Sequence, residues 1–223
     1  MAVQHQQRSS SVTAGVADRA ARAGLWLLPV HALLLAVSTL THQPDPREDF
    51  AGYADYVTTD VFLVSHLVAS ILGAALGVLG LVAALWFLVA GPTARRAVWG
   101  AAAGIVGTVV TTSVLGPAAF AQPAIGRAYQ DGLTGIEAVD EDVYGTPLFA
   151  TAGVGLLGLV VGAILLGTAI SRSRPDLRLA GIGYAVLLPV FAVIGIPFGP
   201  VQPVAALALT FVTVLIARRL PGR

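Results

Sequence analysis

The chain of 223 residues contains no cysteine and no lysine. The absence of thiols excludes disulfides, thiolate metal sites and thiol catalysis, and the absence of lysine excludes Schiff-base chemistry. All 13 basic residues are therefore arginine. Arginine without lysine, in a chain rich in Ala, Val, Gly and Leu, is typical of a GC-rich genome, and from this we infer a bacterial protein.

Charged residues of either sign are scarce. Only 11% of the chain is charged and 56% is hydrophobic, whereas an average soluble domain is about 25% charged and about 45–50% apolar. So few charges would not cover a surface that faces water. The net charge of +1 gives no general attraction to nucleic acid. The composition predicts an integral membrane protein whose main partner is the lipid bilayer.

Six apolar runs are long enough to cross a membrane, which takes about 20 residues in a helix, with a range of about 17–25. None of them contains Asp, Glu, Lys or Arg. We predict an all-α fold, a polytopic transmembrane bundle of six spans. The link at 195–200 is itself apolar, so five spans with a broken final segment is the alternative. The predicted spans are residues 25–41, 61–90, 97–121, 148–170, 179–196 and 201–217.

Charge alternates between the segments that join these runs. With six spans, 11 of the 13 arginines fall on one side and 10 of the 12 acidic residues fall on the other. Short cytoplasmic loops are enriched in arginine and lysine, so we expect both termini in the cytoplasm and the protein in the plasma membrane, the inner membrane of a bacterium. Residues 1–24 are predicted to be a disordered tail, 25–218 the membrane domain and 219–223 a second short tail.

Three pairs of glycines are spaced four residues apart, which lets two helix backbones approach closely. Packing within the bundle is the preferred interpretation, because small residues are common at such contacts. The alternative is a face for a homo-oligomer or for a membrane partner subunit. The pairs are Gly73 and Gly77, Gly100 and Gly104, and Gly158 and Gly162.

Histidines are the ionisable residues of the apolar runs. His31 lies in the first span, His42 at its outer end and His66 in the second span. Because imidazole ligates haem iron, a haem held between His31 and His66 is one hypothesis. The paired-histidine signatures of metal sites are absent, so a hydrogen bond from each histidine to a neighbouring helix is the preferred interpretation.

A cluster of acidic residues, Glu137, Asp140, Glu141 and Asp142, occupies the outer segment between the third and fourth spans. Carboxylates at close spacing bind Ca²⁺ or Mg²⁺, but the glycine turn and ligand spacing of a calcium loop are missing. A solvated run of charge is therefore preferred. Together with His42, residues Glu137, Asp140 and Asp142 form a candidate polar site on the outer face. A short amphipathic helix is also expected in this segment.

The favoured function is that of a non-enzymatic carrier or an accessory membrane subunit. No span contains a carboxylate or an arginine, groups on which proton-coupled pumps commonly rely. The first alternative is a haem-binding redox protein that uses His31 and His66. The second is an intramembrane lipid-modifying enzyme that uses His42 and His66 with the acidic segment. The sequence predicts no catalytic residue and no metal site, and it contains no recognisable catalytic motif.

Overall fold

The computed structural model describes residues 15–41 and 43–222, and it is all-helical, with 83% helix and no strand in the described residues. Six helical stretches are long and apolar enough to cross a membrane, which confirms the predicted number. They are Gly15–Ser38, Asp60–Leu88, Ala94–Gln130, Ile136–Ser173, Pro175–Ile194 and Val201–Arg219.

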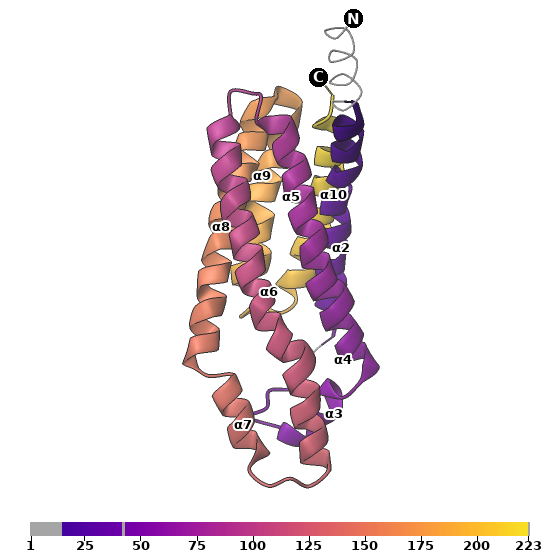
Figure 1. Ribbon diagram of the computed structural model, residues 1–223, viewed down its shortest axis with the longest axis vertical. Helices are drawn as coiled ribbons and strands as arrows, with labels where there is room; N and C mark the ends of the chain where they lie inside the picture. The colour runs from indigo at the N-terminus through magenta and orange to yellow at the C-terminus, as the bar shows by residue number, and fades with distance from the viewer. Residues whose placement is uncertain (1–14, 42, 223) are drawn as a thin grey trace, which may run out of the picture.

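The long helices form one elongated bundle (Figure 1). It consists of α2 (Leu27–Ser38), α5 (Gly73–Leu88), α6 (Ala94–Gln130), α8 (Thr146–Ser173), α9 (Arg178–Pro189) and α10 (Val201–Arg219). The first and last described residues lie at the same end of the bundle. The short helices α3 (Phe50–Val57), α4 (Asp60–Val64) and α7 (Ile136–Val143) lie at the opposite end. The predicted amphipathic helix in the outer segment is confirmed as α7.

Two predicted boundaries were wrong. Residues 15–25 are helical, so the first helix includes ten residues that the sequence analysis assigned to the tail, while residues 1–14 lie outside the described residues. The third helix continues through Pro117 and Pro123 to Gln130, past the predicted end at residue 121. Tertiary packing supports this extension: a Cβ on Gly126 would lie 2.9 Å from the carbonyl oxygen of Ala54 in α3.

Two of the spans contain π-helical segments, in which one extra residue widens a turn. The segment η1 (Ser65–Leu72) lies between α4 and α5, and η3 (Val190–Ile194) follows directly after Pro189 in α9. Proline removes a backbone donor and favours such a local rearrangement. The second and fifth candidate spans are therefore irregular helices.

Glycines bring α6 and α8 into direct backbone contact. A Cβ on Gly162 would lie 2.5 Å from the Cα of Gly104, and a Cβ on Gly158 would lie 2.8 Å from the Cα of Gly107. Side chains at these positions would force the helices apart, which is the physical basis of small-residue packing. The prediction that the glycine pairs pack within the bundle is confirmed for α6 and α8. The remaining pair, Gly73 and Gly77, faces α2.

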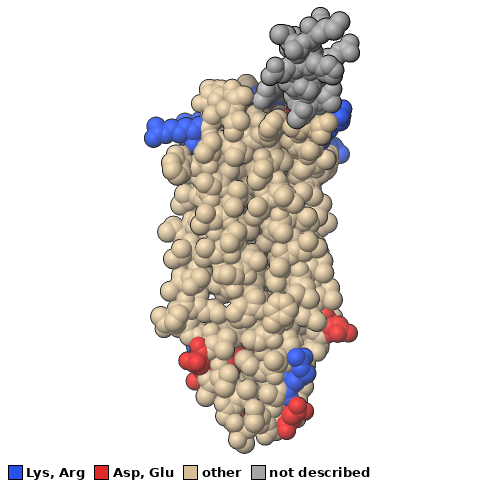
Figure 2. All heavy atoms as spheres, viewed as in Figure 1, with Lys and Arg blue, Asp and Glu red and all other residues tan. Residues whose placement is uncertain are grey.

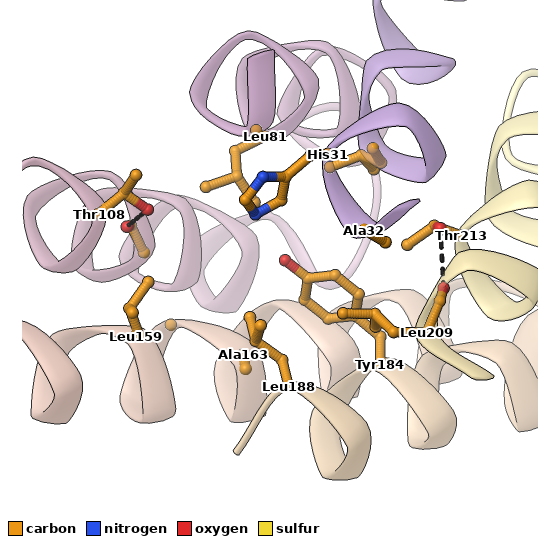
Figure 3. Close-up of a pocket in the computed structure, with 14 residues that line it drawn as sticks. His31, Ala32, Leu81, Thr108, Leu159, Ala163, Tyr184, Leu188, Leu209 and Thr213 are labelled. Atoms are coloured by element: carbon orange, nitrogen blue, oxygen red, sulfur yellow. Dashed lines mark hydrogen bonds between the residues drawn. The ribbon is translucent and has the colours of Figure 1, made fainter. Parts of the chain in front are cut away.

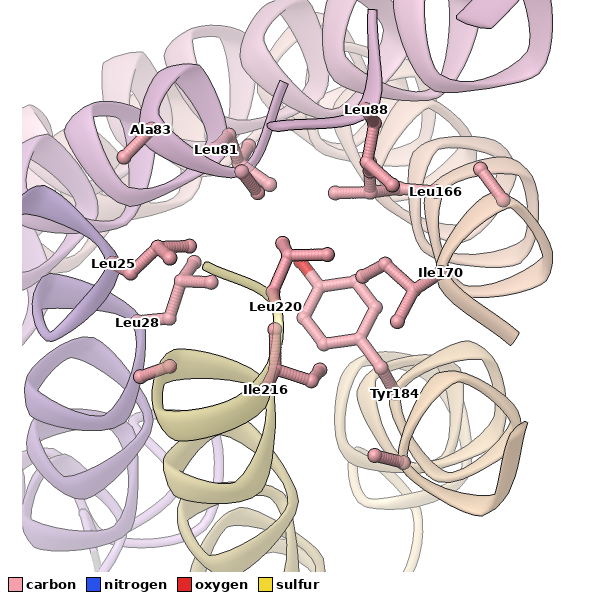
Figure 4. Close-up of a cluster of buried hydrophobic side chains, with 14 of the residues drawn as sticks. Leu25, Leu28, Leu81, Ala83, Leu88, Leu166, Ile170, Tyr184, Ile216 and Leu220 are labelled. Carbon is pink, nitrogen blue, oxygen red and sulfur yellow. The ribbon is translucent and has the colours of Figure 1, made fainter. Parts of the chain in front are cut away.

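The larger hydrophobic core fills the half of the bundle that contains the first and last described residues. Figure 4 shows aliphatic side chains from several helices that converge around Tyr184. Leu25, Leu88, Leu166, Ile170 and Ile216 are fully or almost fully buried there. A second, smaller core at the opposite end joins α3 and α4 through Tyr53, Val57 and Phe62.

Charge is segregated between the two ends (Figure 2). The end that carries residues 15 and 222 holds nine of the described arginines and two aspartates, and we call it the arginine end. The opposite end, with α3 and α7, holds most of the acids, and we call it the acidic end. The nine arginines are Arg19, Arg22, Arg95, Arg96, Arg172, Arg174, Arg178, Arg218 and Arg219, and the two aspartates are Asp18 and Asp176.

Candidate functional site

A small cavity of about 20 Å³ lies inside the bundle, where all six long helices meet (Figure 3). Most of its lining is aliphatic or glycine, and four polar side chains reach it. These are His31 from α2, Thr108 from α6, Tyr184 from α9 and Thr213 from α10. A polar cavity of this size has room for about one water molecule, since a water needs roughly 10–15 Å³. We call it the central cavity.

His31 lies against the glycines of α5. A Cβ on Gly77 would lie 2.9 Å from His31 Cδ2 and 3.1 Å from its Nε2, so the imidazole fits only because these side chains are absent. The Nδ1 atom is buried and makes no hydrogen bond of standard geometry with the described residues, and the backbone of Gly73 in α5 is close enough to interact with it. The ring and the hydroxyl of Tyr184 point toward one another (Figure 3). The hydrogen bond predicted from His31 to a neighbouring helix therefore has one candidate partner among the described residues, the backbone of Gly73 in α5, without standard geometry.

The two threonines of the central cavity satisfy their protons locally. Thr108 donates to the carbonyl of Gly104 at 2.8 Å, and Thr213 donates to the carbonyl of Leu209 at 2.8 Å. Their hydroxyl oxygens keep lone pairs that can accept. The cavity therefore offers acceptors from the threonines, and both donors and acceptors from Tyr184 and His31. That set suits a small neutral molecule with hydroxyl or amide groups, or a water molecule.

His66 does not line the central cavity. Its Nδ1 lies 2.9 Å from the carbonyl oxygen of Phe62 in its own helix, and its ring stacks on Phe62 with the centroids 4.1 Å apart. The partner predicted on a neighbouring helix is therefore wrong for this residue. Because His31 lies against Gly73 and Gly77, which follow His66 by seven and eleven residues, the two rings are offset by about 10–16 Å along the helix. Two imidazoles on one metal need their nitrogens about 4 Å apart, given bonds of about 2 Å. The haem hypothesis gains no support from this arrangement.

Asp140 is the only member of the predicted outer polar site that the structure shows to be buried. It is 4% exposed and accepts a hydrogen bond of 2.8 Å from the hydroxyl of Tyr53 in α3. Glu137 and Asp142 are exposed, and His42 lies outside the described residues. No group of three potential metal ligands occurs in the part of the chain that the structure describes. The described members do not converge on one point.

Asp140 is a buried acid with neighbours that shift its pKa in opposite directions. Helix α7, with its four carboxylates, lies outside the apolar part of the bundle. Burial raises the pKa of the Asp140 carboxyl, the hydrogen bond from Tyr53 opposes that rise, and the nearby charge of Glu141 adds to it. Burial likewise raises the pKa of the Tyr53 hydroxyl. The pair joins α7 to α3 and so connects the two helical segments of the acidic end.

The sequence analysis missed Tyr53, Gln122 and Tyr144. The Gln122 Oε1 atom and the Tyr144 hydroxyl are both buried and make no hydrogen bond of standard geometry with the described residues. Burial raises the pKa of Tyr144, the charge of Asp140 adds to that rise, and a weak interaction of the hydroxyl with the Gln122 side chain opposes it. The sequence contained one signal for the burial of Asp140. It follows the apolar residue Ile136 by four positions, which places both on one face of a helix, and the structure shows that both are buried.

Comparison with known proteins assigns no family. The chain matches no family model, no curated protein and no solved structure. A fold by itself does not establish a function, which depends on the geometry and chemistry of a site. The function is therefore argued from the central cavity and from the two ends of the bundle.

Proposed function

We propose that the chain is an integral protein of the plasma membrane that crosses it six times, with the arginine end in the cytoplasm. The number and apolar character of the long helices support the crossing. The collection of nine arginines at one end supports the orientation, because positive residues are retained on the cytoplasmic side. The lysine-free composition supports a bacterial inner membrane.

Single-cysteine labelling tests this orientation directly, because the chain has no cysteine of its own. Thr134 is exposed at the acidic end and Pro92 is exposed at the arginine end, so the two variants are Thr134→Cys and Pro92→Cys. A membrane-impermeant maleimide added to spheroplasts should label the first variant, and it should label the second only after the membrane is permeabilised. The reverse pattern would overturn the orientation, and labelling of both without permeabilisation would overturn the six-span topology.

Within that topology, the function that the geometry supports best is that of a non-enzymatic carrier for a small neutral polar solute. The observation that carries this proposal is the central cavity, where His31 and Tyr184 face each other at the point where all six long helices meet. Carriers place their substrate sites at such midpoints between helices. Burial of polar groups at membrane depth costs free energy, so their presence there indicates a functional role. No Asp, Glu or Arg lines the cavity, which favours an uncharged substrate.

The two irregular helices support the carrier proposal, because a carrier must change conformation around its substrate site. The π-helical segment η1 ends at Leu72, five residues before the cavity residue Gly77, and η3 begins two residues after the cavity residue Leu188. Such π-helical insertions occur frequently at functional sites, and helix kinks arise at them and at proline. Bending at these two places would widen the cavity toward the acidic end.

Reconstitution tests the carrier proposal. Proteoliposomes are exposed to an osmotic gradient of glycerol, urea or a small sugar, and the recovery of vesicle volume is followed by light scattering. Tyr184→Phe removes one hydroxyl from the cavity at nearly constant shape, and Tyr56→Phe removes one at the acidic end as a matched control. Loss of one hydrogen bond worth about 0.5–1.5 kcal/mol should slow transport by roughly 2- to 12-fold in Tyr184→Phe alone. Flux no faster than in protein-free vesicles for every solute would overturn the proposal.

An accessory membrane subunit is the second candidate, and the volume of the central cavity favours it. About 20 Å³ accommodates a water molecule but not a larger solute in this conformation. An accessory subunit would use the outer surfaces of its helices to bind a partner, and His31 and Tyr184 would then serve packing alone. In that case the reconstituted protein would show no solute flux, and both tyrosine variants would behave alike.

A further inference from the structure

A second and larger cavity, of about 340 Å³, lies at the arginine end. Its walls come from the turn between α5 and α6, from the C-terminal end of α8 and from the last described residues of the chain. Its apolar surface includes Phe87, Leu88 and Leu220, and its polar side chains are Thr93, Ser173 and Arg174. It combines an apolar surface with a cationic group. We call it the arginine-end pocket.

Arg174 is held in place by its neighbours. Its Nε and Nη2 donate to the carboxylate of Asp176 at 3.0 and 3.1 Å, and its Nη1 donates to the carbonyl oxygen of Arg219 at 3.1 Å. A guanidinium has five N–H donors, so two of them stay available. These belong to Nη1 and Nη2, the two nitrogens with which arginine binds phosphate in a bidentate manner. The pocket therefore contains a preoriented cation with donors to spare.

Thr93 supplies an independent sign of a missing partner. It lines the same pocket, and its Oγ1 atom is buried without a hydrogen bond to any described residue. A buried hydroxyl without a partner costs about 1–3 kcal/mol, so a ligand that accepts its proton would remove this cost. The hydroxyl of Ser173, by contrast, donates to the carbonyl of Ile170 at 2.7 Å.

We propose that the arginine-end pocket binds the phosphate of an anionic phospholipid, with Arg174 and Thr93 as donors and the apolar surface in contact with the first part of an acyl chain. The charge of this end favours the ligand, because the arginine end carries nine of the described arginines and only two aspartates. Basic pockets between helices on the cytoplasmic side are suited to such headgroups. An apolar surface beside the cation distinguishes a lipid from free phosphate. This inference is independent of the carrier proposal.

Native mass spectrometry of the whole protein in mixed micelles tests the proposal. The micelles contain either dioleoyl phosphatidylglycerol or dioleoyl phosphatidylcholine, and the occupancy of bound lipid is measured as a function of lipid concentration. Phosphatidylglycerol should bind with an affinity at least tenfold higher than phosphatidylcholine. Arg174→Gln should lower the affinity for phosphatidylglycerol by about tenfold, whereas Arg178→Gln, an exposed arginine of the same end that does not line the pocket, should leave it unchanged.

Two further variants keep the test independent of folding. Thr93→Val preserves the shape of the side chain and should weaken binding of phosphatidylglycerol several-fold. Asp176→Asn removes the carboxylate that competes for Arg174 and should strengthen binding, whereas Asp18→Asn at the same end should not. A purely structural role for the Arg174–Asp176 pair would make Asp176→Asn weaken binding, and that result would overturn the proposal. Equal affinity for the two lipids, or saturable binding of inorganic phosphate that displaces the lipid, would overturn it as well.

Discussion

The contact between α6 and α8 allows a sharp prediction for Gly162→Ala. The added Cβ would lie 2.5 Å from both the Cα and the amide nitrogen of Gly104, whereas carbon atoms in contact are normally about 3.5–4.0 Å apart. The two backbones must therefore part by roughly 1 Å. Overpacking of this kind costs about 1–3 kcal/mol.

Gly153 on the same helix provides the matched control, because a Cβ there would meet nothing within 4 Å. Alanine is a better helix former than glycine by about 0.5–1 kcal/mol, and both variants gain this amount. The difference between the two variants therefore isolates the clash. We expect Gly162→Ala to be less stable than Gly153→Ala by about 1–3 kcal/mol.

The assay is reversible unfolding in mixed micelles by titration with sodium dodecyl sulfate, followed by tryptophan fluorescence. A double variant adds a second test of the same contact. Once Gly162→Ala has separated the helices, Gly100→Ala, whose Cβ would lie 2.5 Å from the amide nitrogen of Leu166 in α8, should cost less than it does alone, since neighbouring sites that share a contact are not additive. Equal stability of Gly162→Ala and Gly153→Ala, within about 0.5 kcal/mol, would refute the close backbone contact.

Two predictions concern the acidic end. Tyr144→Phe removes a buried hydroxyl that makes no hydrogen bond of standard geometry with the described residues, and it should leave the free energy of unfolding unchanged or raise it by up to about 1 kcal/mol. Tyr53→Phe deprives the buried Asp140 of its donor and should lower the free energy of unfolding by about 1–3 kcal/mol. Equal effects of the two substitutions in thermal melts would contradict this difference. Because burial raises the pKa of Asp140, its contribution to stability is fully present below the pKa of the unfolded chain and is lost as the pH rises through the raised pKa. The melting temperature of Asp140→Asn relative to the wild type should therefore rise between pH 4 and pH 7, and a flat or falling difference, or an equal trend in the exposed Asp142→Asn, would count against it.

The sequence predicted the class of fold because a bilayer constrains each spanning segment by its own length and composition. Apolar runs of about 20 residues are required by the thickness of the hydrocarbon, and each such run satisfies its own backbone as a helix. The count of six candidate spans and the segregation of charge followed from that reasoning. The predicted helix ends were less accurate. The first helix begins at Gly15, in a polar segment, and the third continues to Gln130 through a segment that contains proline. In such segments the packing of neighbouring elements determines where a helix ends.

The candidate sites depended on the tertiary structure to a greater degree. The spacing of Gly73 and Gly77 predicts a close approach, but only the fold shows that the imidazole of His31 occupies the space. Asp140 and Asp142 are equivalent in composition, and the register of α7 against α3 buries one and exposes the other. Arg174 is one of 13 arginines in the sequence, and it is distinguished by the residues that hold its guanidinium.

The physical reason is the range over which each interaction acts. Hydrophobic length, helix periodicity and charge asymmetry are local properties of a chain, so the sequence by itself determined six apolar helices with arginine at one end and acids at the other. His31 and Tyr184 line one cavity, and Thr93 and Arg174 line another, although the two members of each pair are far apart in the chain. These arrangements form only when the helices pack against one another. Here the packing is determined by backbone contact through glycine and by the buried side chains of the core.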